Sequence, residues 1–394
     1  MPVKDRWLLP DGVEEILPAE ARRLEAMRRR ILDLFQAWGY ELVMPPLIEY
    51  LESLLTGAGK DMDLQTFKLT DQLTGRLMGV RADMTPQAAR IDAHYLKRRA
   101  PTRLCYLGPV LRTRPDEFAG SREPLQLGAE LFGYAGPEAD AEILSLMLAA
   151  LAAAGVTNPH IDLGHVGVFR GLAGQARLHP DLEAELFESM QRKARNDAEG
   201  LLAEDDVPAA ARRMLLALFE LNGGAEVPAA ARAALREAPP EVARALDDLE
   251  AIARIVAREP EAPPLHFDLA ELSGYHYYTG AVFSAFVPGH GRALAKGGRY
   301  DGIGRAFGRE RAATGFGADL RQLLKISTSA DGRTTGVLAP AADDAELRRE
   351  IARLRAAGER VVAQLPDDGA RAADYGCDRA LVKKNGRWVV EAIK

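Results

Sequence analysis

The apolar positions of the chain follow two periods. Between 20 and 38 they recur every three or four residues, and Gly39 follows, which predicts a helix. Between 64 and 134 they fall in short runs such as LQTFKLT, RLMGV and LQLGAELFGY, which predict strands. An alanine-rich helix over 139–154 and a strand at 160–164 complete this part. Strands grouped with few helices predict an α+β fold built on an antiparallel sheet, rather than alternating βαβ units.

Two changes of pattern predict the domain organisation. From about 170 to 257 the sequence is almost entirely helix-forming, which favours a helical insertion between two sheet-forming halves. A polar stretch of small residues at 326–335 predicts a linker after a core of residues 1–325. Beyond it, residues 336–394 predict a small α/β domain that ends in a hairpin, because an Asn-Gly pair separates two apolar runs.

Composition and charge narrow the class of protein. The 394 residues are 47% hydrophobic and 27% charged, and the net charge of −6 argues against a dedicated nucleic-acid binder. Cys105 and Cys377 lie far apart, which excludes a disulfide framework and suits a reducing compartment. Neither a signal pattern nor a run of about 18 apolar residues occurs. We therefore expect a cytoplasmic protein that does not bind membranes.

Common catalytic signatures are missing from the sequence. TGAGKD at 56–61 lacks the glycine spacing and the final Ser or Thr of a phosphate-binding loop, and neither GxSxG nor HExxH occurs. His160 and His165, the closest pair of histidines, have odd spacing on a predicted strand and therefore point to opposite faces. We expect no metal site and no cofactor.

Polar residues on strand-like segments are the remaining candidates for a site. In LQLGAELFG, alternation places Gln126 and Glu130 on the face opposite the leucines, and such a face either contacts water or lines a pocket. If RADMT is extended, Asp83 and Thr85 share a face by the same period.

A second candidate segment is ELSGYHYYTG, followed by the apolar AVFSAF. Read as a strand, it sends Tyr277 and Tyr278 to opposite faces. The glycine-rich GGRYDG at 297–302 allows close backbone approach. Two carboxylates, an amide, a hydroxyl and several phenols together suit a small zwitterion: carboxylates bind an ammonium group, and tyrosines accommodate an imidazole or another planar group.

In order and spacing, these segments resemble the catalytic core of histidyl-tRNA synthetase. The resemblance covers most of residues 10–325, through WGYELVMPPLIEY, TFKLTDQLTGRLMGVRADMTPQAAR, SREPLQLGAELFG, LSGYHYYTGAVF and AKGGRYDGIG. It implies a class II synthetase-like core, with helices flanking the sheet, that self-associates through the segment holding Pro45. It also implies a histidine-binding pocket, although Asp83 stands where the family has a glutamate. The residues that the resemblance assigns to this pocket are Asp83, Thr85, Arg112, Gln126, Glu130, Tyr277, Tyr278 and Tyr300.

The positions that handle ATP in the synthetases depart from the family pattern. Ser273 and Gln322 stand where the resemblance expects arginines, Asp319 replaces a glycine, and Arg114 replaces a glutamate, while Arg112 is kept. Adenylation requires positive groups around the α-phosphate, and the loss of one such contact typically costs about 10²–10³ in rate. The resemblance therefore implies a core without catalytic residues.

A synthetase-like core that keeps its histidine pocket but loses its ATP arginines resembles the family of regulatory subunits of ATP phosphoribosyltransferase. This implies a noncatalytic partner of the short-form catalytic subunit in the first step of histidine biosynthesis, in a hetero-octamer inhibited by histidine. The short C-terminal domain implies no nucleic-acid partner. The alternative is an active histidyl-tRNA synthetase or a related amino-acid adenylating ligase. Two positions stay open for the effector histidine: this pocket, or the interface with the catalytic subunit.

Overall fold

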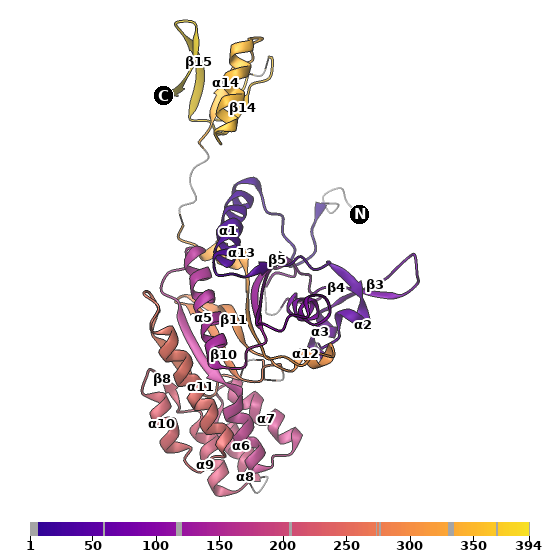
Figure 1. Cartoon of the computed structure of the whole chain (residues 1–394), viewed down its shortest axis with the longest axis vertical. Helices are drawn as coiled ribbons and strands as arrows, with labels where there is room; N and C mark the ends of the chain where they lie inside the picture. Colours follow the sequence, from indigo (N-terminus) through magenta and orange to yellow (C-terminus); the bar gives the residue numbers. More distant parts are fainter. Residues whose placement is uncertain are drawn as a thin grey trace. The chain divides into compact units, whose positions relative to one another are not determined.

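The computed structural model divides into two compact units, Met1–Ser329 and Ala330–Lys394. Figure 1 shows both along the chain. The residues that the structure describes are 7–57, 60–115, 120–204, 207–272, 274–275, 277–329, 335–367 and 369–393.

A nine-stranded sheet forms the centre of the larger unit, in the order β1-β5-β6-β12-β11-β10-β7-β9-β8. Its strands are β1 (Glu41–Leu42), β5 (Thr102–Pro109), β6 (Leu125–Phe132), β7 (His160–His165), β8 (Asn222–Gly223), β9 (Leu265–Asp268), β10 (Ala281–Val287), β11 (His290–Arg299) and β12 (Ala313–Asp319).

The sheet is mixed rather than wholly antiparallel. All neighbours from β5 to β7 pair antiparallel, as predicted. However, β1 pairs parallel with β5, and β9 pairs parallel with β7. Two adjacent parallel strands require a long crossover connection between them, and the helical insertion is that connection for β7 and β9.

Helices cover one face of this sheet. Helix α1 (Pro18–Ala37) buries Leu24, Met27, Ile31 and Phe35, as their spacing predicts, and Gly39 follows with a φ of +81°. Helices α5 (Pro137–Ala153) and α13 (Leu320–Ile326) pack beside α1 in the same core. The leucines of β6 face this core, as alternation predicts.

Shorter elements pack near the other face. They include the three-stranded sheet β2-β4-β3 and a second apolar cluster around Met84, Tyr106 and Tyr300. The elements are β2 (Ile48–Tyr50), α2 (Leu51–Leu54), α3 (Lys60–Gln65), β3 (Phe67–Thr70), β4 (Leu77–Val80), α4 (Thr85–Arg90), η2 (Ile91–Leu96) and α12 (Ile303–Ala306).

The predicted helical insertion is present and gathers at one end of the larger unit in Figure 1. Its helices are α6 (Val166–Ala176), α7 (Pro180–Gln191), α8 (Arg195–Glu204), α9 (Ala209–Ala217), α10 (Val227–Ala234) and α11 (Pro240–Val256). One short strand that the sequence did not predict interrupts the insertion, since β8 pairs with β9 at the sheet edge. A two-residue strand has no alternation that a sequence could reveal.

The smaller unit holds a four-stranded sheet in the order β14-β13-β15-β16. Asn385 and Gly386 both have positive φ, which confirms the predicted type I′ hairpin turn. Its elements are β13 (Val337–Ala339), α14 (Ala345–Ala356), β14 (Val361–Ala363), β15 (Arg379–Lys384) and β16 (Arg387–Ala392). Across the described parts of both units, every helix is too short or too polar to cross a membrane.

Candidate functional site

The described residues of the segment 271–280 form turns and bends, and the prediction of a strand there is wrong. Gly274 has a φ of +74°, and its carbonyl oxygen accepts the amides of both Tyr277 and Tyr278 at 2.8 Å. The turn therefore brings the two tyrosine rings together in an edge-on contact, with centroids 5.3 Å apart, instead of sending them to opposite faces. The positive φ at the glycine decides this conformation, against the strand preference of the aromatic residues.

Asp83 and Thr85 belong to a helix start rather than to an extended segment. Thr85 begins α4, Pro86 occupies the first turn, and Asp83 Oδ1 accepts the Thr85 amide at 2.7 Å. Proline and a short carboxylate side chain both favour a helix N-terminus. Gln126 on β6 joins this start to the sheet, because its Oε1 accepts the Met84 amide at 2.9 Å and its Nε2 donates to Asp83 at 3.0 Å.

Glu130 on β6 is the buried acid of the site, with 1% of its surface exposed. It accepts hydrogen bonds from the hydroxyls of Tyr106, at 2.8 Å, and of Tyr300. The Tyr106 hydroxyl also lies 2.9 Å from Thr85 Oγ1. Burial raises the pKa of Glu130 to about 8, the hydrogen bonds from both tyrosines act against that rise, and the nearby Asp83 charge adds to it.

Two glycines make room for this cluster. A Cβ on Gly128 would lie 2.5 Å from the Tyr106 ring, and a Cβ on Gly315 would collide with the Glu130 carboxylate. A side chain at Gly128 would displace Tyr106, which donates to Glu130, and a side chain at Gly315 would displace the Glu130 carboxylate itself. The polar face of β6 is therefore a packed cluster of buried polar side chains.

Tyrosine rings form one wall of the site. Tyr277 stacks on Tyr300 with centroids 5.1 Å apart and an interplanar angle of 20°, and 36% of its surface is exposed to solvent. Tyr278 packs over Gly298, where a Cβ would lie 3.0 Å from the ring. Burial, followed by the charge of Glu130, raises the pKa of Tyr278 and Tyr300, so these two phenols remain neutral.

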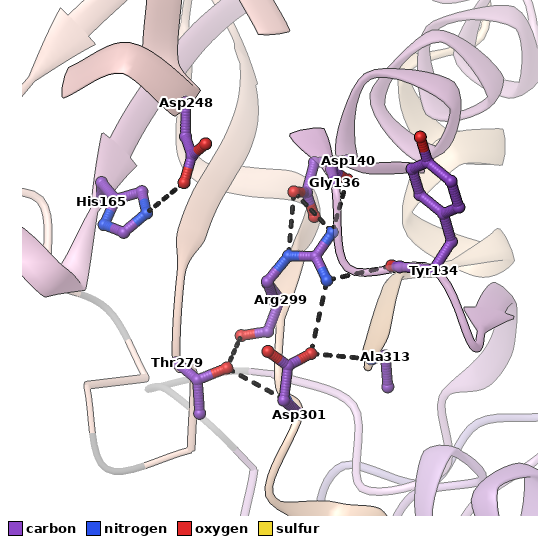
Figure 2. Close-up of polar contacts among 9 residues, drawn as sticks. All are labelled: Tyr134, Gly136, Asp140, His165, Asp248, Thr279, Arg299, Asp301 and Ala313. Carbon is purple, nitrogen blue, oxygen red and sulfur yellow. Dashed lines mark hydrogen bonds and ion pairs between the residues drawn. The ribbon is translucent and has the colours of Figure 1, made fainter. Parts of the chain in front are cut away.

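A buried ion pair, shown in Figure 2, positions the end of β11 and hence Tyr300. Arg299 donates to Asp140 Oδ2 through Nε, at 3.0 Å, and through Nη2, at 2.8 Å. The same guanidinium donates to the carbonyl oxygens of Tyr134 and Gly136. Arg299 thus ties β11 to the start of α5 beneath the tyrosine wall.

Thr279 connects the two sides of this wall. Its amide donates to the Arg299 carbonyl at 2.7 Å, and its hydroxyl accepts the Asp301 amide at 3.0 Å. Asp301 Oδ1 accepts the Ala313 amide at 2.8 Å and lies 3.4 Å from Arg299 Nη1 (Figure 2). These hydrogen bonds join Thr279, which follows Tyr278, to Arg299 and Asp301, which flank Tyr300.

The side expected to bind ATP holds a carboxylate. Asp319 caps α13, where its Oδ1 accepts the amide of Arg321 at 3.0 Å. Burial raises the pKa of Asp319, and the hydrogen bonds from the amides of Arg321 and Leu125 oppose that rise. Arg112 donates through Nε to the carbonyl oxygen of Ala82, at 3.4 Å, beside Asp83 in the chain. Ser273 and His276 lie outside the described residues.

Tyr106 is the site residue that the sequence did not reveal. It lies on β5 opposite Gly128 of β6, and this pairing brings its hydroxyl to Glu130. Strand alternation in RLCYLG separates Tyr106 from Cys105, but only the register with β6 shows which residue faces Glu130.

Comparisons with known proteins agree with this geometry. A family model described as histidyl-tRNA synthetase matches residues 12–323, and one described as the C-terminal domain of the ATP phosphoribosyltransferase subunit HisZ matches residues 334–391. The ATP phosphoribosyltransferase regulatory subunit of Alkalilimnicola ehrlichii is 56% identical, over 99% of this chain and 98% of its own length.

Solved structures share the fold. An ATP phosphoribosyltransferase regulatory subunit/histidyl-tRNA synthetase from Bacillus halodurans is 28% identical and matches with a TM-score of 0.84, over 95% of this chain and 97% of its own. Histidyl-tRNA synthetase from Nostoc, at 17% identity, matches with a TM-score of 0.80 over 98% and 97% of the two chains. This last similarity shows a common fold alone.

Proposed function

The chain belongs to the histidyl-tRNA synthetase-like family of ATP phosphoribosyltransferase regulatory subunits. From this premise we propose that it binds the short-form catalytic subunit, supports the first step of histidine biosynthesis, and transmits feedback inhibition by histidine. It acts by binding, without adenylating an amino acid itself.

The main support for a histidine site is the position of Glu130, a buried carboxyl group that accepts hydrogen bonds from two tyrosine hydroxyls. Histidine brings an ammonium group, and a cation near Glu130 and Asp83 would lower the pKa of Glu130 and favour its charged form. Thr85 and Gln126 add hydrogen-bonding groups beside them. Arg112, whose Nε donates to the Ala82 carbonyl oxygen next to Asp83 in the chain, is the proposed partner of the histidine carboxylate.

The imidazole ring would pack against the tyrosine wall. Tyr277 and Tyr300 already stack on each other, and Tyr278 meets Tyr277 edge-on. Stacked and edge-on aromatic contacts favour a planar ring in the same place. Tyr277 is partly exposed to solvent, so its ring is the one that we expect to move when a ligand binds.

Feedback inhibition requires that histidine bind one state of the assembly better than another. The proposed assembly is a hetero-octamer of regulatory and catalytic subunits. The effector could act from this pocket or from the interface with the catalytic subunit, and site variants separate the two cases. A cytoplasmic location is part of the proposal and agrees with two buried free cysteines.

The experiment combines binding and activity. We expect the chain to stimulate phosphoribosyl-ATP formation by the short catalytic subunit, and histidine to inhibit the mixture. Glu130→Gln removes a charge that faces the ammonium group, so histidine affinity measured by calorimetry should fall by roughly 10–100-fold. Glu250→Gln, on the exposed side of α11, is the matched control and should bind as the wild type does.

Three outcomes distinguish the parts of the proposal. Failure to stimulate the catalytic subunit would overturn the regulatory function. Unchanged inhibition in Glu130→Gln would move the effector to the subunit interface. Histidine-dependent pyrophosphate–ATP exchange by the chain alone would instead support the adenylating ligase.

A further inference from the structure

Three side chains converge on β7 and β9, outside the candidate histidine site. His160 Nε2 lies 2.9 Å from Asp162 Oδ1, and His266 Nδ1 lies 3.0 Å from the same oxygen. The three atoms all lie within 4.8 Å of one another, and the two imidazole rings are 5.0 Å apart. None of these residues takes part in the proposed histidine site or its supporting network.

Two paired strands hold this cluster in place. Asp162 and His266 are register partners in the parallel pair of β7 and β9. His160 precedes Asp162 by two residues and therefore shares its face. Ile161 and Leu163 alternate with them and are fully buried in the main core, so β7 cannot turn to separate the cluster. The convergence is therefore built into the sheet.

We propose that His160, Asp162 and His266 bind a divalent transition-metal ion of the zinc class. Two imidazoles and one carboxylate form the ligand set that such ions prefer, whereas Mg²⁺ and Ca²⁺ prefer oxygen ligands alone. The side chains of His160 and His266 are 53% and 32% exposed, so the remaining coordination positions face solvent.

The expectation of no metal site rested on His160 and His165, which the odd spacing separates. The structure supplies a different second imidazole, His266, from a strand on the far side of the helical insertion. Spacing along one strand cannot reveal a ligand that arrives by parallel pairing with another.

The position of the site suggests what the ion does. β7 leads directly into α6, and β9 is the strand that follows α11, so the site joins the two strands at which the insertion leaves and rejoins the sheet. An ion bound only to the folded state stabilises that state by mass action. The proposed role is therefore to stabilise the base of the insertion, without a part in catalysis.

The test uses the untagged full chain, treated with a chelator and titrated with Zn²⁺ in buffer free of histidine. We expect one ion per chain by calorimetry, and a ligand-field absorption spectrum when Co²⁺ replaces Zn²⁺. His160→Ala and His266→Ala should each weaken binding by about tenfold or more. They should also abolish the rise in melting temperature that Zn²⁺ gives the wild type.

The matched control is His179→Ala. His179 lies 3.4 Å from Asp181 in an exposed histidine–aspartate pair, outside the proposed cluster. This variant should bind Zn²⁺ as the wild type does. A wild-type dissociation constant for Zn²⁺ above about 100 μM, which corresponds to a binding free energy of roughly −5.5 kcal/mol, would overturn the proposed site. Equal Zn²⁺ affinity in His160→Ala and the wild type would also overturn it. Circular dichroism of each variant shows that the fold is retained.

Discussion

Glu130 is a carboxyl group that folding moves from water into a cluster of phenols. Burial raises its pKa from 4.5 to about 8, so the folded state keeps a proton that the unfolded state releases in that range. The contribution of Glu130 to stability is therefore complete below about pH 4.5 and is lost as the pH rises through about 8. Glu130→Gln cannot titrate and should lose this part of the pH dependence.

Urea unfolding of both proteins between about pH 5 and 8 measures the effect. We expect the free energy of unfolding of the wild type to fall relative to that of Glu130→Gln by on the order of a few kcal/mol across this range. A constant difference between the two proteins would contradict the raised pKa.

Gly128 is required by the ring that faces it. A Cβ at this position would meet the Tyr106 ring at 2.5 Å, so Gly128→Ala should destabilise the protein by roughly 1–3 kcal/mol. Moving Tyr106 would also loosen its bond to Glu130 and weaken histidine binding. The control is Gly174→Ala, at an exposed position of α6, where a Cβ meets nothing within 4 Å and stability should rise by roughly 0.5–1 kcal/mol. Equal stability of Gly128→Ala and the wild type in urea would contradict this account.

At this scale, alternation correctly predicts that Gln126 and Glu130 share the polar face of β6. Asp83 and Thr85 lie beside them, although through a helix start rather than an extended segment. Tyr106 could not be predicted, because its role depends on a cross-strand register that the sequence does not state. The assignment of these residues to histidine stays a prediction.

Among the elements, β11 and α5 are joined by the ion pair of Arg299 and Asp140. Asp140→Ala would leave a buried guanidinium with Asp301, at 3.4 Å, as its nearest carboxylate. Removing one partner of a buried pair typically costs about 3–5 kcal/mol. We expect a loss of this size in urea unfolding and a displaced Tyr300 that weakens histidine binding.

The double variant Asp140→Leu/Arg299→Met tests whether the unpaired charge of Arg299 causes this loss of stability. It removes both charges, so it should be more stable than Asp140→Ala, because no unpaired charge remains buried. A double variant that is less stable than Asp140→Ala would show that the carbonyl contacts of Arg299, rather than its charge, hold the two elements together.

Helices and the central antiparallel strands could be predicted because each has a period of its own. The parallel pairings of β1 with β5 and of β9 with β7 could not, since they depend on which segments meet in space. The segment 271–280 shows a further limit. Its aromatic residues favour a strand, but the positive φ at Gly274 makes it a turn.

At the scale of the whole molecule, the family follows from a combination that no single motif shows. The larger unit matches the histidyl-tRNA synthetase family over residues 12–323, while the amino-acid pocket and the replacement of ATP-site residues at Asp319 and Gln322 stay predictions from the resemblance. The C-terminal unit matches the model of the C-terminal domain of the ATP phosphoribosyltransferase subunit HisZ over residues 334–391. The predicted site, which would bind an amino acid without reacting with it, suits a subunit that controls another enzyme. Such control requires the chains to associate.

Self-association is the prediction that belongs to this scale. Large apolar side chains around Pro45 are exposed: Met44 at 76%, and both Leu47 and Ile48 at 45%. Contiguous exposed apolar residues mark association surfaces. We predict that copies of the chain associate through this surface, so Met44→Asp/Ile48→Asp should weaken self-association by about tenfold or more in sedimentation experiments, because it places charges at the predicted contact.

Leu365→Asp, an exposed apolar position in the C-terminal unit, is the matched control and should sediment as the wild type does. The monomeric variant should keep its circular dichroism, since its altered side chains lie on the surface. If stimulation of the catalytic subunit falls together with self-association, the dimer is the form that assembles. A variant that sediments as the wild type does would place the contact between copies on another surface of the larger unit.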